Sequence, residues 1–258
     1  MRIYIPSRGR WHKQSTVKNL PPIVLPNVTI VVPVDEYENY ARNMPMVEVV
    51  SPDIPSGIGP CRQWCCEQED KKVIMMDDDL VFATRRADDP TKFRESTDQE
   101  IEHLIGSIDD SLDTYAHVGV STREGGNRYT KDYDWNTRLL RVLAYRTDIL
   151  AEEGIHFDQI PVMEDFYVGL SLLTRGYRNI KHNYMVHNQH GSGTEGGCST
   201  YRDKDMQAQA AHKLADTFPE FVTAVEKETK GAWGGGVRTD VRIQWKKALA
   251  SAPEIQTL

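Results

Sequence analysis

The stretch VIMMDDDL, residues 73–80, places three consecutive aspartates directly after four apolar residues. A wholly apolar run that ends in acids is typical of a buried central strand that stops at the edge of a sheet. Three neighbouring carboxylates repel one another, so they need a compensating cation, hydrogen-bond donors or solvent. A solvated acidic turn is one interpretation, and a cation site at the end of a strand is the other.

Short apolar runs on either side of this stretch predict further strands, and amphipathic stretches between them predict helices. The expected strands are residues 2–6, 28–34, 72–76, 116–121 and 141–146, and the expected helices include residues 59–69 and 97–115. Strands that alternate with helices predict a mixed, mostly parallel α/β sheet flanked by helices. Ligand sites in such sheets lie beyond the carboxyl ends of the strands, where the three aspartates fall.

The composition is that of a globular protein, with 39% hydrophobic and 27% charged residues among 258. No apolar run approaches the roughly 18 residues that a membrane helix needs, so we expect no membrane contact and a cytoplasmic location. The four cysteines lack paired CxxC spacing, which favours free thiols over a zinc site or a disulfide framework. A net charge of −7 argues against a nonspecific grip on nucleic acid but leaves a local basic surface open.

Two further segments carry candidate chemistry. Glu164 and Asp165 begin a predicted amphipathic helix, where acids are favoured by the helix dipole or serve a function. His187 and His190 lie in VHNQHGSG, and His187 directly follows the apolar residues YMV at a predicted strand end. The following GSGTEGGCSTYR could bring backbone amides close to a phosphate or could be a plain connection.

The order of these motifs resembles that of GT-A-type glycosyltransferases. The shared segments are PSRGR after the first strand, GIGPCRQW, MMDDDL, VMEDFYVGLSLLTRGYRN and VHNQHGSGTEGGCSTYR. Within that class the chain most resembles the TET-associated glycosyltransferases, a mainly phage-encoded family linked to hypermodification of DNA bases. The resemblance covers residues 1–215, and we expect residues 216–258 to form a C-terminal helical extension of the same domain.

The resemblance implies a divalent cation, Mn²⁺ or Mg²⁺, that bridges the diphosphate of a nucleotide sugar, with a UDP-sugar as the family-typical donor. Asp79 is then the first choice for a direct ligand, Asp77 faces the ribose or reaches the metal through water, and Asp78 does either. His187 or His190 would complete the metal site, with His187 preferred. The residues expected to contact the nucleotide are Pro6, Ser7, Arg8, Arg10 and Arg62. In an inverting enzyme Asp165 would be the general base, and Glu164 would orient acceptor or sugar hydroxyls.

The expected acceptor is modified DNA, most specifically 5-hydroxymethylcytosine in phage DNA, which places the protein in the host cytoplasm. Basic groups that contact phosphates and aromatic faces that stack bases both occur between residues 121 and 146. They are Arg123, Arg128, Lys131, Arg138, Arg141 and Arg146, with Tyr129, Tyr133 and Trp135. A second basic group near the C-terminus comprises Arg238, Arg242, Lys246 and Lys247. A glycan, a lipid-linked sugar or a protein is the alternative acceptor.

Overall fold

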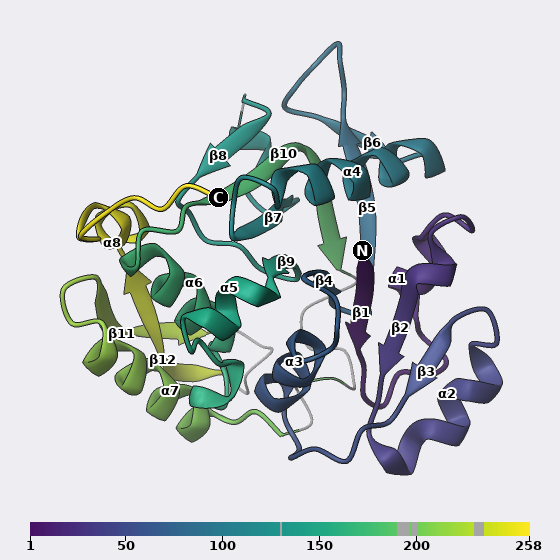
Figure 1. Ribbon diagram of the computed structural model, residues 1–258, viewed down its shortest axis with the longest axis horizontal. Helices are drawn as coiled ribbons and strands as arrows, with labels where there is room; N and C mark the ends of the chain where they lie inside the picture. Colours follow the sequence, from purple (N-terminus) through teal and green to yellow (C-terminus); the bar gives the residue numbers. More distant parts are fainter. Residues whose placement is uncertain (130, 190–196, 198–200, 230–234) are drawn as a thin grey trace.

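The computed structural model of the chain describes residues 1–129, 131–189, 197, 201–229 and 235–258 (Figure 1). Within this part, one sheet holds ten strands in the order β3-β2-β1-β4-β9-β7-β10-β5-β6, with β8 paired to β10, and β11 and β12 form a separate hairpin. The strands are β1 (Arg2–Pro6), β2 (Val28–Val31), β3 (Glu48–Val50), β4 (Lys72–Met76), β5 (Leu80–Arg85), β6 (Phe93–Glu95), β7 (His117–Thr122), β8 (Tyr133–Trp135), β9 (Val142–Arg146), β10 (Asn179–Gln189), β11 (Val222–Thr229) and β12 (Gly236–Ile243). The helices are α1 (Ser15–Asn19), α2 (Tyr37–Asn43), α3 (Ile58–Cys66), α4 (Asp98–Ser111), α5 (Thr147–Glu152), α6 (Glu164–Thr174), α7 (Lys204–Thr217) and α8 (Trp245–Ala250).

The sheet combines parallel and antiparallel pairs. Strands β3, β2, β1 and β4 are parallel neighbours, and β7 is parallel to β10. Strand β9 lies antiparallel between β4 and β7, so the carboxyl ends of β1, β4, β7 and β10 still face the same edge of the sheet. The predicted mixed α/β sheet flanked by helices is confirmed, and all five expected strands are present.

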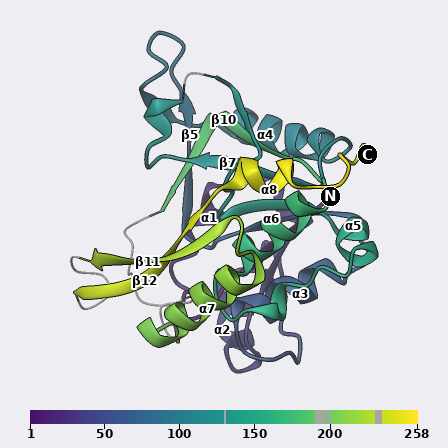
Figure 2. The same cartoon turned by 90° about the vertical axis from the view of Figure 1, so that its left-hand side faces the viewer.

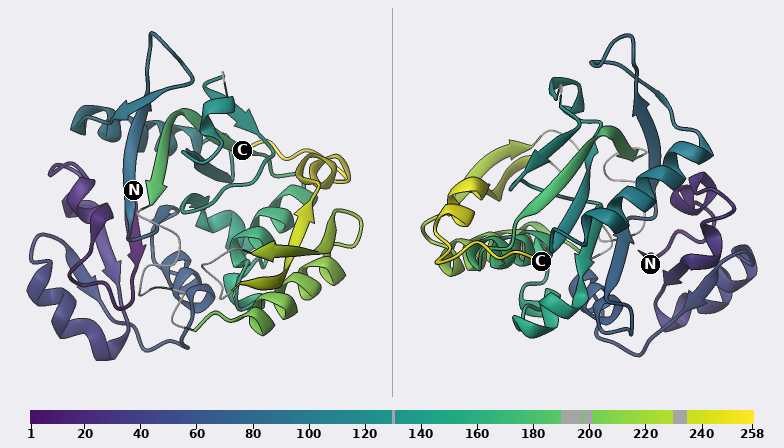
Figure 3. Two further views of the ribbon diagram at one scale, coloured as in Figure 1. Left: turned by 180° about the vertical axis from the view of Figure 1, so that it is seen from behind. Right: turned by 45° about the horizontal axis from the view of Figure 1, so that its top comes forward.

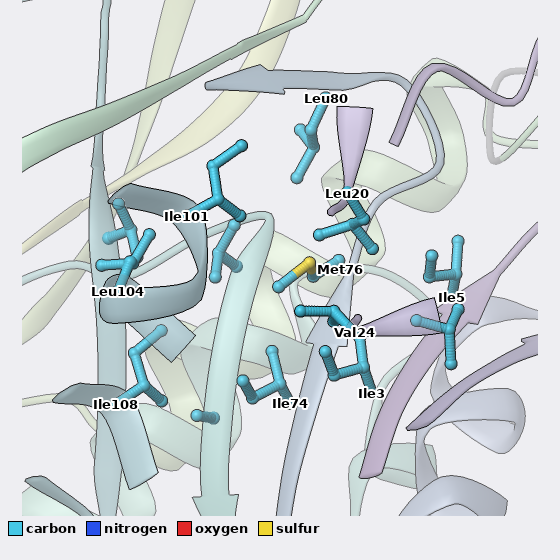
Figure 4. Close-up of a cluster of buried hydrophobic side chains, with 14 of the residues drawn as sticks. Ile3, Ile5, Leu20, Val24, Ile74, Met76, Leu80, Ile101, Leu104 and Ile108 are labelled. Atoms are coloured by element: carbon cyan, nitrogen blue, oxygen red, sulfur yellow. The ribbon is translucent and has the colours of Figure 1, made fainter. Parts of the chain in front are cut away.

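Alternate residues of the central strands pack on opposite faces of the sheet, as a period of two requires. On one face Ile3, Ile74 and Met76 pack with Ile101 and Leu104 of α4 in a buried cluster (Figure 4). On the other face Tyr4, Val73, Met75, Leu143 and Tyr145 pack with residues of α3, α5 and α6. The sheet is therefore the middle of three layers, and its apolar strands are buried on both sides.

The two helices expected from the sequence begin at recognisable signals. Helix α4 starts with a capping box, in which Thr97 and Glu100 satisfy each other's backbone N–H groups. Helix α3 starts after Gly57, whose φ of 137° is a conformation that glycine adopts readily. A Cβ atom on Gly59 would lie 2.7 Å from the backbone oxygen of Phe157, so only glycine lets α3 approach that segment.

The C-terminal segment differs from the expected helical extension. Residues 216–258 contain the β11–β12 hairpin and the short helix α8, together with the end of α7. Val222 and Val241 of the hairpin and Ala248 of α8 pack with α6 and α7 in a third buried cluster. In β12, Val237, Val241 and Ile243 alternate with Arg238, Asp240 and Arg242, which is the period of two that a half-exposed strand requires. The expectation of helix was wrong there, and the domain boundary at residue 215 stays a prediction.

Two sequence expectations about the whole chain concern membranes and cysteines. No helix in the described ranges is long and apolar enough to cross a membrane. Cys61, Cys65 and Cys66 carry free thiols along α3, with Cys65 fully buried and the other two half-buried. Cys198 lies outside the described residues.

Candidate active site

A cleft of about 950 Å³ opens at the edge of the sheet where β1 and β4 end. Its lining includes residues that follow β1 and β4, the segments 31–35 and 52–58, and the start of α6. The hairpin β11–β12 and the loop before β9 complete its walls. Figures 1 and 3 show β1 to β3 and the hairpin on opposite sides of α3. The three aspartates of the opening motif therefore lie where the sequence predicted a ligand site.

The loop that carries the aspartates is held by α1. The hydroxyl of Thr16 donates a hydrogen bond to the carbonyl of Asp77 over 2.5 Å and accepts one from the N–H of Leu80 over 2.9 Å. The N–H of Thr16 bonds to the carbonyl of Asp78 over 3.2 Å. These bonds satisfy backbone groups of the loop and fix it, so the carboxylates need little reorganisation when a ligand binds.

Asp78 is the buried member of the triplet, with 4% of the residue exposed. Its carboxylate accepts hydrogen bonds from the hydroxyl of Ser7 and from Arg10, whose Nη1 lies 2.6 Å from Oδ1. Burial raises the pKa of Asp78, and Arg10 opposes that shift. The Ser7 hydroxyl is also 2.8 Å from the hydroxyl of Tyr40, which links α2 to the site. Asp78 therefore anchors the turn after β1 to the end of β4.

Asp79 and Asp77 present their carboxylates differently. Oδ2 of Asp79 is 3.1 Å from Nη1 of Arg10, whereas its buried Oδ1 has no hydrogen-bond partner within the described part of the chain. The Asp77 side chain is 35% exposed, and its Oδ1 lies 3.4 Å from Nη2 of Arg62. Desolvation raises the pKa of Asp77 to about 6 although Arg62 opposes the shift. A buried carboxylate oxygen without a donor is a position that a cation can satisfy.

Arg62 connects the aspartate loop to α6. Its Nη1 is 2.5 Å from Oε1 of Glu164, and the two side chains are only 8% and 6% exposed. Burial raises the pKa of Glu164, and the charge of Arg62 opposes that shift. The pair spans elements that are far apart in sequence, so it fixes α3, β4 and α6 relative to one another. Because Arg62 contacts both Glu164 and Asp77, Glu164 helps to fix the start of α6 relative to the aspartate loop.

Asp165 lies one residue further along α6 and lines the cleft. Within the described ranges, no side chain donates a hydrogen bond to its carboxylate and no cation forms an ion pair with it. Met163, the residue before α6, has a φ of 64°, and Arg141, whose carbonyl accepts a hydrogen bond from the N–H of Asp77, also has a φ of 64°. Such left-handed conformations are costly for residues other than glycine and cluster at functional sites. Met163 and Arg141 both line the cleft.

The five residues that were expected to contact the nucleotide all line the cleft: Pro6, Ser7, Arg8, Arg10 and Arg62. Sequence reasoning missed the segments 31–35 and 52–58, which form the wall beside them. The signal available there was the proline-rich sequence SPDIPSG, residues 51–57, which ends in the glycine before α3. It also missed Tyr201, Arg202 and Gln207, which line the cleft near α7.

The preferred histidine does not reach the cleft. His187 is fully buried within β10 and stands opposite Phe82 of β5. Burial lowers its pKa to about 3. Gln189, two residues further on, stands opposite Leu80 and lines the cleft. His187 follows an apolar run because it belongs to the buried part of a long strand, so the strand end was placed too early in the sequence. His190 lies outside the described residues.

The aromatic segment expected to hold an acceptor lies elsewhere. Trp135 stands opposite Ile180 at the start of β10, whereas Gln189 at its other end reaches the cleft. The register with β7 makes this separation about six strand residues, or roughly 20 Å at 3.3 Å per residue. Trp135 donates a hydrogen bond to the hydroxyl of Tyr115 over 3.0 Å. Of the basic residues in that segment, Arg138 and Arg141 do line the cleft.

A divalent cation is compatible with the carboxylates, although protein groups alone do not complete its coordination. No three His, Cys, Asp or Glu side chains among the described residues are arranged to hold a metal ion. The oxygen ligands that Mg²⁺ and Mn²⁺ prefer are supplied by Asp79 and Asp77 at the cleft. Mg²⁺ in particular is commonly bound by one or two carboxylates together with the phosphates of its substrate.

Comparison with known proteins gives one family and several similar folds. A family profile described as TET-Associated Glycosyltransferase matches residues 1–197. A structure titled GalNAc-T7 with UDP, GalNAc and Mn²⁺ is 11% identical, with a TM-score of 0.48, and the match covers 73% of this chain but only 43% of that one. A CMP:2-keto-3-deoxy-manno-octonic acid synthetase complexed with CTP is 13% identical, with a TM-score of 0.42, over 70% of this chain and 88% of that one.

A 4-diphosphocytidyl-2C-methyl-D-erythritolsynthase from Anaerococcus prevotii is 10% identical, with a TM-score of 0.44, over 82% of this chain and 95% of that one. No protein with curated annotation matches the sequence significantly.

Proposed function

The chain belongs to the TET-associated glycosyltransferase family, and from that premise we propose that it transfers a sugar from a UDP-sugar to the hydroxyl group of 5-hydroxymethylcytosine in DNA. The transfer depends on a divalent cation and inverts the anomeric configuration of the sugar. The single observation that carries this proposal is that Asp77, Asp79 and Asp165 line one cleft. An inverting transfer needs such acids on two sides of the sugar, to hold the donor and to activate the acceptor.

The donor is assigned to the wall formed by β1, β2 and α3. Segments 31–35 and 52–58 present proline backbone and apolar side chains on which a nucleobase can lie. Arg8 is held there by a hydrogen bond of 2.9 Å to the hydroxyl of Ser56, and Arg10 lies beside Asp78 and Asp79. These cations attract a diphosphate and the aspartates can share a cation with it, so the nucleotide sugar reaches from this wall to the sheet edge.

The metal assignment uses the groups already described. Asp79, through its unpartnered Oδ1, and Asp77 would hold the cation, and the cation would neutralise the charge that develops on the leaving nucleoside diphosphate. His190, the residue after the cleft-lining Gln189, remains the histidine candidate for this site from the sequence. His187 is not proposed as a ligand because it lies within the sheet, away from the cleft lining.

Asp165 is assigned as the general base. Its carboxylate lines the cleft without a cation or a donor among the described residues, so it can accept the proton of the acceptor hydroxyl as that oxygen attacks the anomeric carbon. The sugar–phosphate bond breaks on the opposite side, and the nucleoside diphosphate leaves with the bonding electrons. Glu164 and Arg62 keep the start of α6 at a fixed distance from the aspartate loop.

The choice of DNA as acceptor is supported by the family and by charge at the cleft. Arg138 and Arg141 line the cleft from the loop before β9, with Arg138 beside Phe166 of α6 and Arg141 beside Asp77. The guanidinium of Arg138 lies 4.5 Å from the ring centre of Phe166, which holds its charge beside the start of α6. A cation fixed beside the start of α6 suits an acceptor that carries phosphates.

Calorimetry of UDP binding with and without Mn²⁺ tests the donor site. We expect each ligand to strengthen the binding of the other, and Asp79→Ala to abolish that coupling, because the cation that Asp79 would hold would also attract the diphosphate of UDP. Asp88→Ala, which removes an exposed aspartate from the loop between β5 and β6, is the matched control. Coupling that survives Asp79→Ala would contradict the shared site.

Measuring UDP release with several acceptors tests the acceptor. We expect release to rise with DNA that contains 5-hydroxymethylcytosine and to stay at the hydrolysis level with unmodified DNA of the same sequence. Nuclear magnetic resonance of the product should show the anomeric configuration opposite to that of the donor. Retention of configuration would contradict the inverting mechanism, and stimulation by a neutral glycan alone would contradict the DNA acceptor.

A further inference from the structure

The β11–β12 hairpin adds a wall to the cleft outside the segment that matches the family profile. The profile ends at residue 197, whereas the hairpin spans Val222–Ile243. Figure 2 shows the two strands extending beyond the helices that they pack on. Thr229, Arg238 and Asp240 of the hairpin line the same cleft as the aspartates. The hairpin is therefore a part of the site that the family assignment does not explain.

The two faces of the hairpin have different surroundings. Residues that stand directly opposite each other in an antiparallel pair share a face, so Lys227 and Arg238 lie on one face, together with the pair Thr223 and Arg242. We call this the cleft face, because Arg238 and Asp240 on it line the cleft. Val241, on the other face, is buried in the cluster with α6, α7 and α8.

The cleft face carries an excess of positive charge. Lys227 Nζ lies 2.9 Å and Arg238 Nη2 lies 3.2 Å from Oδ2 of Asp240, so one carboxylate is shared by two cations. The Lys227 side chain is 52% exposed, and Arg242 is also exposed. Among the described residues of this face, three cations stand against one carboxylate, so that part of the face is positive on a chain whose net charge is −7. A local positive surface on an acidic protein selects a polyanion by charge complementarity.

We propose that the cleft face of the hairpin docks the phosphate backbone of the DNA strand that carries the acceptor base, through Lys227 and Arg242. This inference rests on the proposed function and identifies the part of the protein that recognises the polymer around the base. Lys227 pairs with Arg238, and Arg242 lies four residues further along β12, about 13 Å away along the strand. Consecutive phosphates of one strand advance about 3.4 Å along the DNA axis, so both side chains can contact one backbone segment.

The hairpin face and the base Asp165 meet at the same cleft, which gives the docking a catalytic consequence. Phosphates held along the hairpin would fix the register of the strand, and the extruded base would enter between the hairpin and α6. Lys227 and Arg242 do not line the cleft themselves, so their removal should leave the donor site intact. The prediction is therefore a defect in binding the polymer, with the chemistry unchanged.

Fluorescence anisotropy of a labelled single-stranded oligonucleotide containing 5-hydroxymethylcytosine tests the proposal over a range of salt concentrations. The double variant Lys227→Gln/Arg242→Gln should weaken binding by on the order of tenfold or more and reduce the slope of log affinity against log salt by about 1.4, which corresponds to two lost phosphate contacts. Lys71→Gln/Lys92→Gln removes the same charge from exposed positions before β4 and before β6, and it is the matched control. Both variants should bind UDP like the wild type.

The outcomes separate this inference from the proposed function. Equal DNA affinity and salt slope for the hairpin variant and the wild type would overturn the inference, and so would an equal loss in the control variant. Wild-type protein that does not bind the oligonucleotide would overturn it as well. If the wild type binds DNA through these two residues but transfers no sugar to it, the proposed function fails while the docking surface is supported.

Discussion

Truncation of Glu164 tests whether the buried ion pair with Arg62 holds the two halves of the site together. The Arg62 and Glu164 side chains are 8% and 6% exposed, and their charged atoms lie 2.5 Å apart. In Glu164→Ala, Asp77 at 3.4 Å is the one anionic partner of the guanidinium left among the residues that the structure describes. Breaking one side of a buried ion pair costs about 3–5 kcal/mol. Because Asp77 remains, we expect the free energy of unfolding to fall by about 3 kcal/mol.

Thermal unfolding followed by circular dichroism gives the first measurement. A loss of about 3 kcal/mol corresponds to a fall in melting temperature of roughly 6–12 °C for a domain of this size. Glu164→Gln, which keeps an oxygen acceptor for Arg62, should cost less. The double variant Arg62→Met/Glu164→Met removes both charges and should regain most of the lost stability, since apolar replacement of a buried pair is often close to neutral.

Donor binding gives the second measurement. The double variant should bind UDP in the presence of Mn²⁺ more weakly than the wild type even where its stability is restored, because Asp77 and the start of α6 lose their common anchor. A fall of less than about 1 kcal/mol in Glu164→Ala would place the pair among surface-like ion pairs and refute the reasoning. A double variant no more stable than Glu164→Ala would refute it too.

Three other variants probe the base, the core and the packing of α3. Asp165→Asn keeps the size of the side chain but loses its basicity, so turnover should fall about 10²–10⁴-fold with UDP affinity nearly unchanged; wild-type rates at saturating donor would exclude this role. His117 is buried and its pKa is lowered to about 3 by that burial, so only the unfolded chain binds its proton as the pH falls from about 6.5 toward 3. Stability should therefore drop over this range, by about 2 kcal/mol at pH 5 from this residue, and His117→Phe should flatten urea-unfolding free energies measured against pH. Gly59→Ala should destabilise the protein by about 1–3 kcal/mol and weaken UDP binding, because its Cβ would lie 2.7 Å from the Phe157 carbonyl. Gly106→Ala in α4, where a Cβ meets nothing within 4 Å, should raise the melting temperature instead, and equal effects of the two changes would show that the contact is unimportant.

The predictable parts of the fold are those in which the local sequence pattern indicates whether a segment is buried. Residues 73–76 of β4 are wholly apolar and are followed by three acids, so both the burial of β4 and the location of the cleft could be predicted from 73–80. The same local logic failed for His187, because β10 is eleven residues long and crosses the sheet before it reaches the cleft. A strand's length is fixed by its partners, here β5 and β7, and those partners are not visible in its own sequence.

The roles within the site depended on tertiary contacts in the same way. Asp77, Asp78 and Asp79 are chemically identical in sequence, and only the fold distinguishes them. Asp78 is buried against Ser7 and Arg10, whereas Asp79 keeps an unpartnered oxygen. The two adjacent acids of α6 also differ, because the carboxylate of Glu164 forms an ion pair with Arg62. Pairings between residues about a hundred positions apart cannot be inferred from spacing alone.

The acceptor surface shows the limit of composition as a guide. Aromatic and basic residues between 121 and 146 have the composition of a nucleic-acid surface, yet Trp135 and Tyr133 pack around β10 at the edge remote from the cleft. The hairpin, whose strands mix charges of both signs, reaches the cleft instead. Proximity to the catalytic groups is a property of the sheet order and cannot be derived from the residue types.

Mass spectrometry of nucleosides tests the central claim most directly. DNA containing 5-hydroxymethylcytosine is incubated with the protein, a mixture of UDP-sugars and Mn²⁺, then digested and compared with a reaction that contains Asp165→Asn. We predict that the wild type converts 5-hydroxymethyl-2′-deoxycytidine to a species heavier by one sugar residue and that the variant forms far less of it. UDP release from the wild type with every nucleoside unchanged in mass would contradict the assignment of modified DNA as the acceptor.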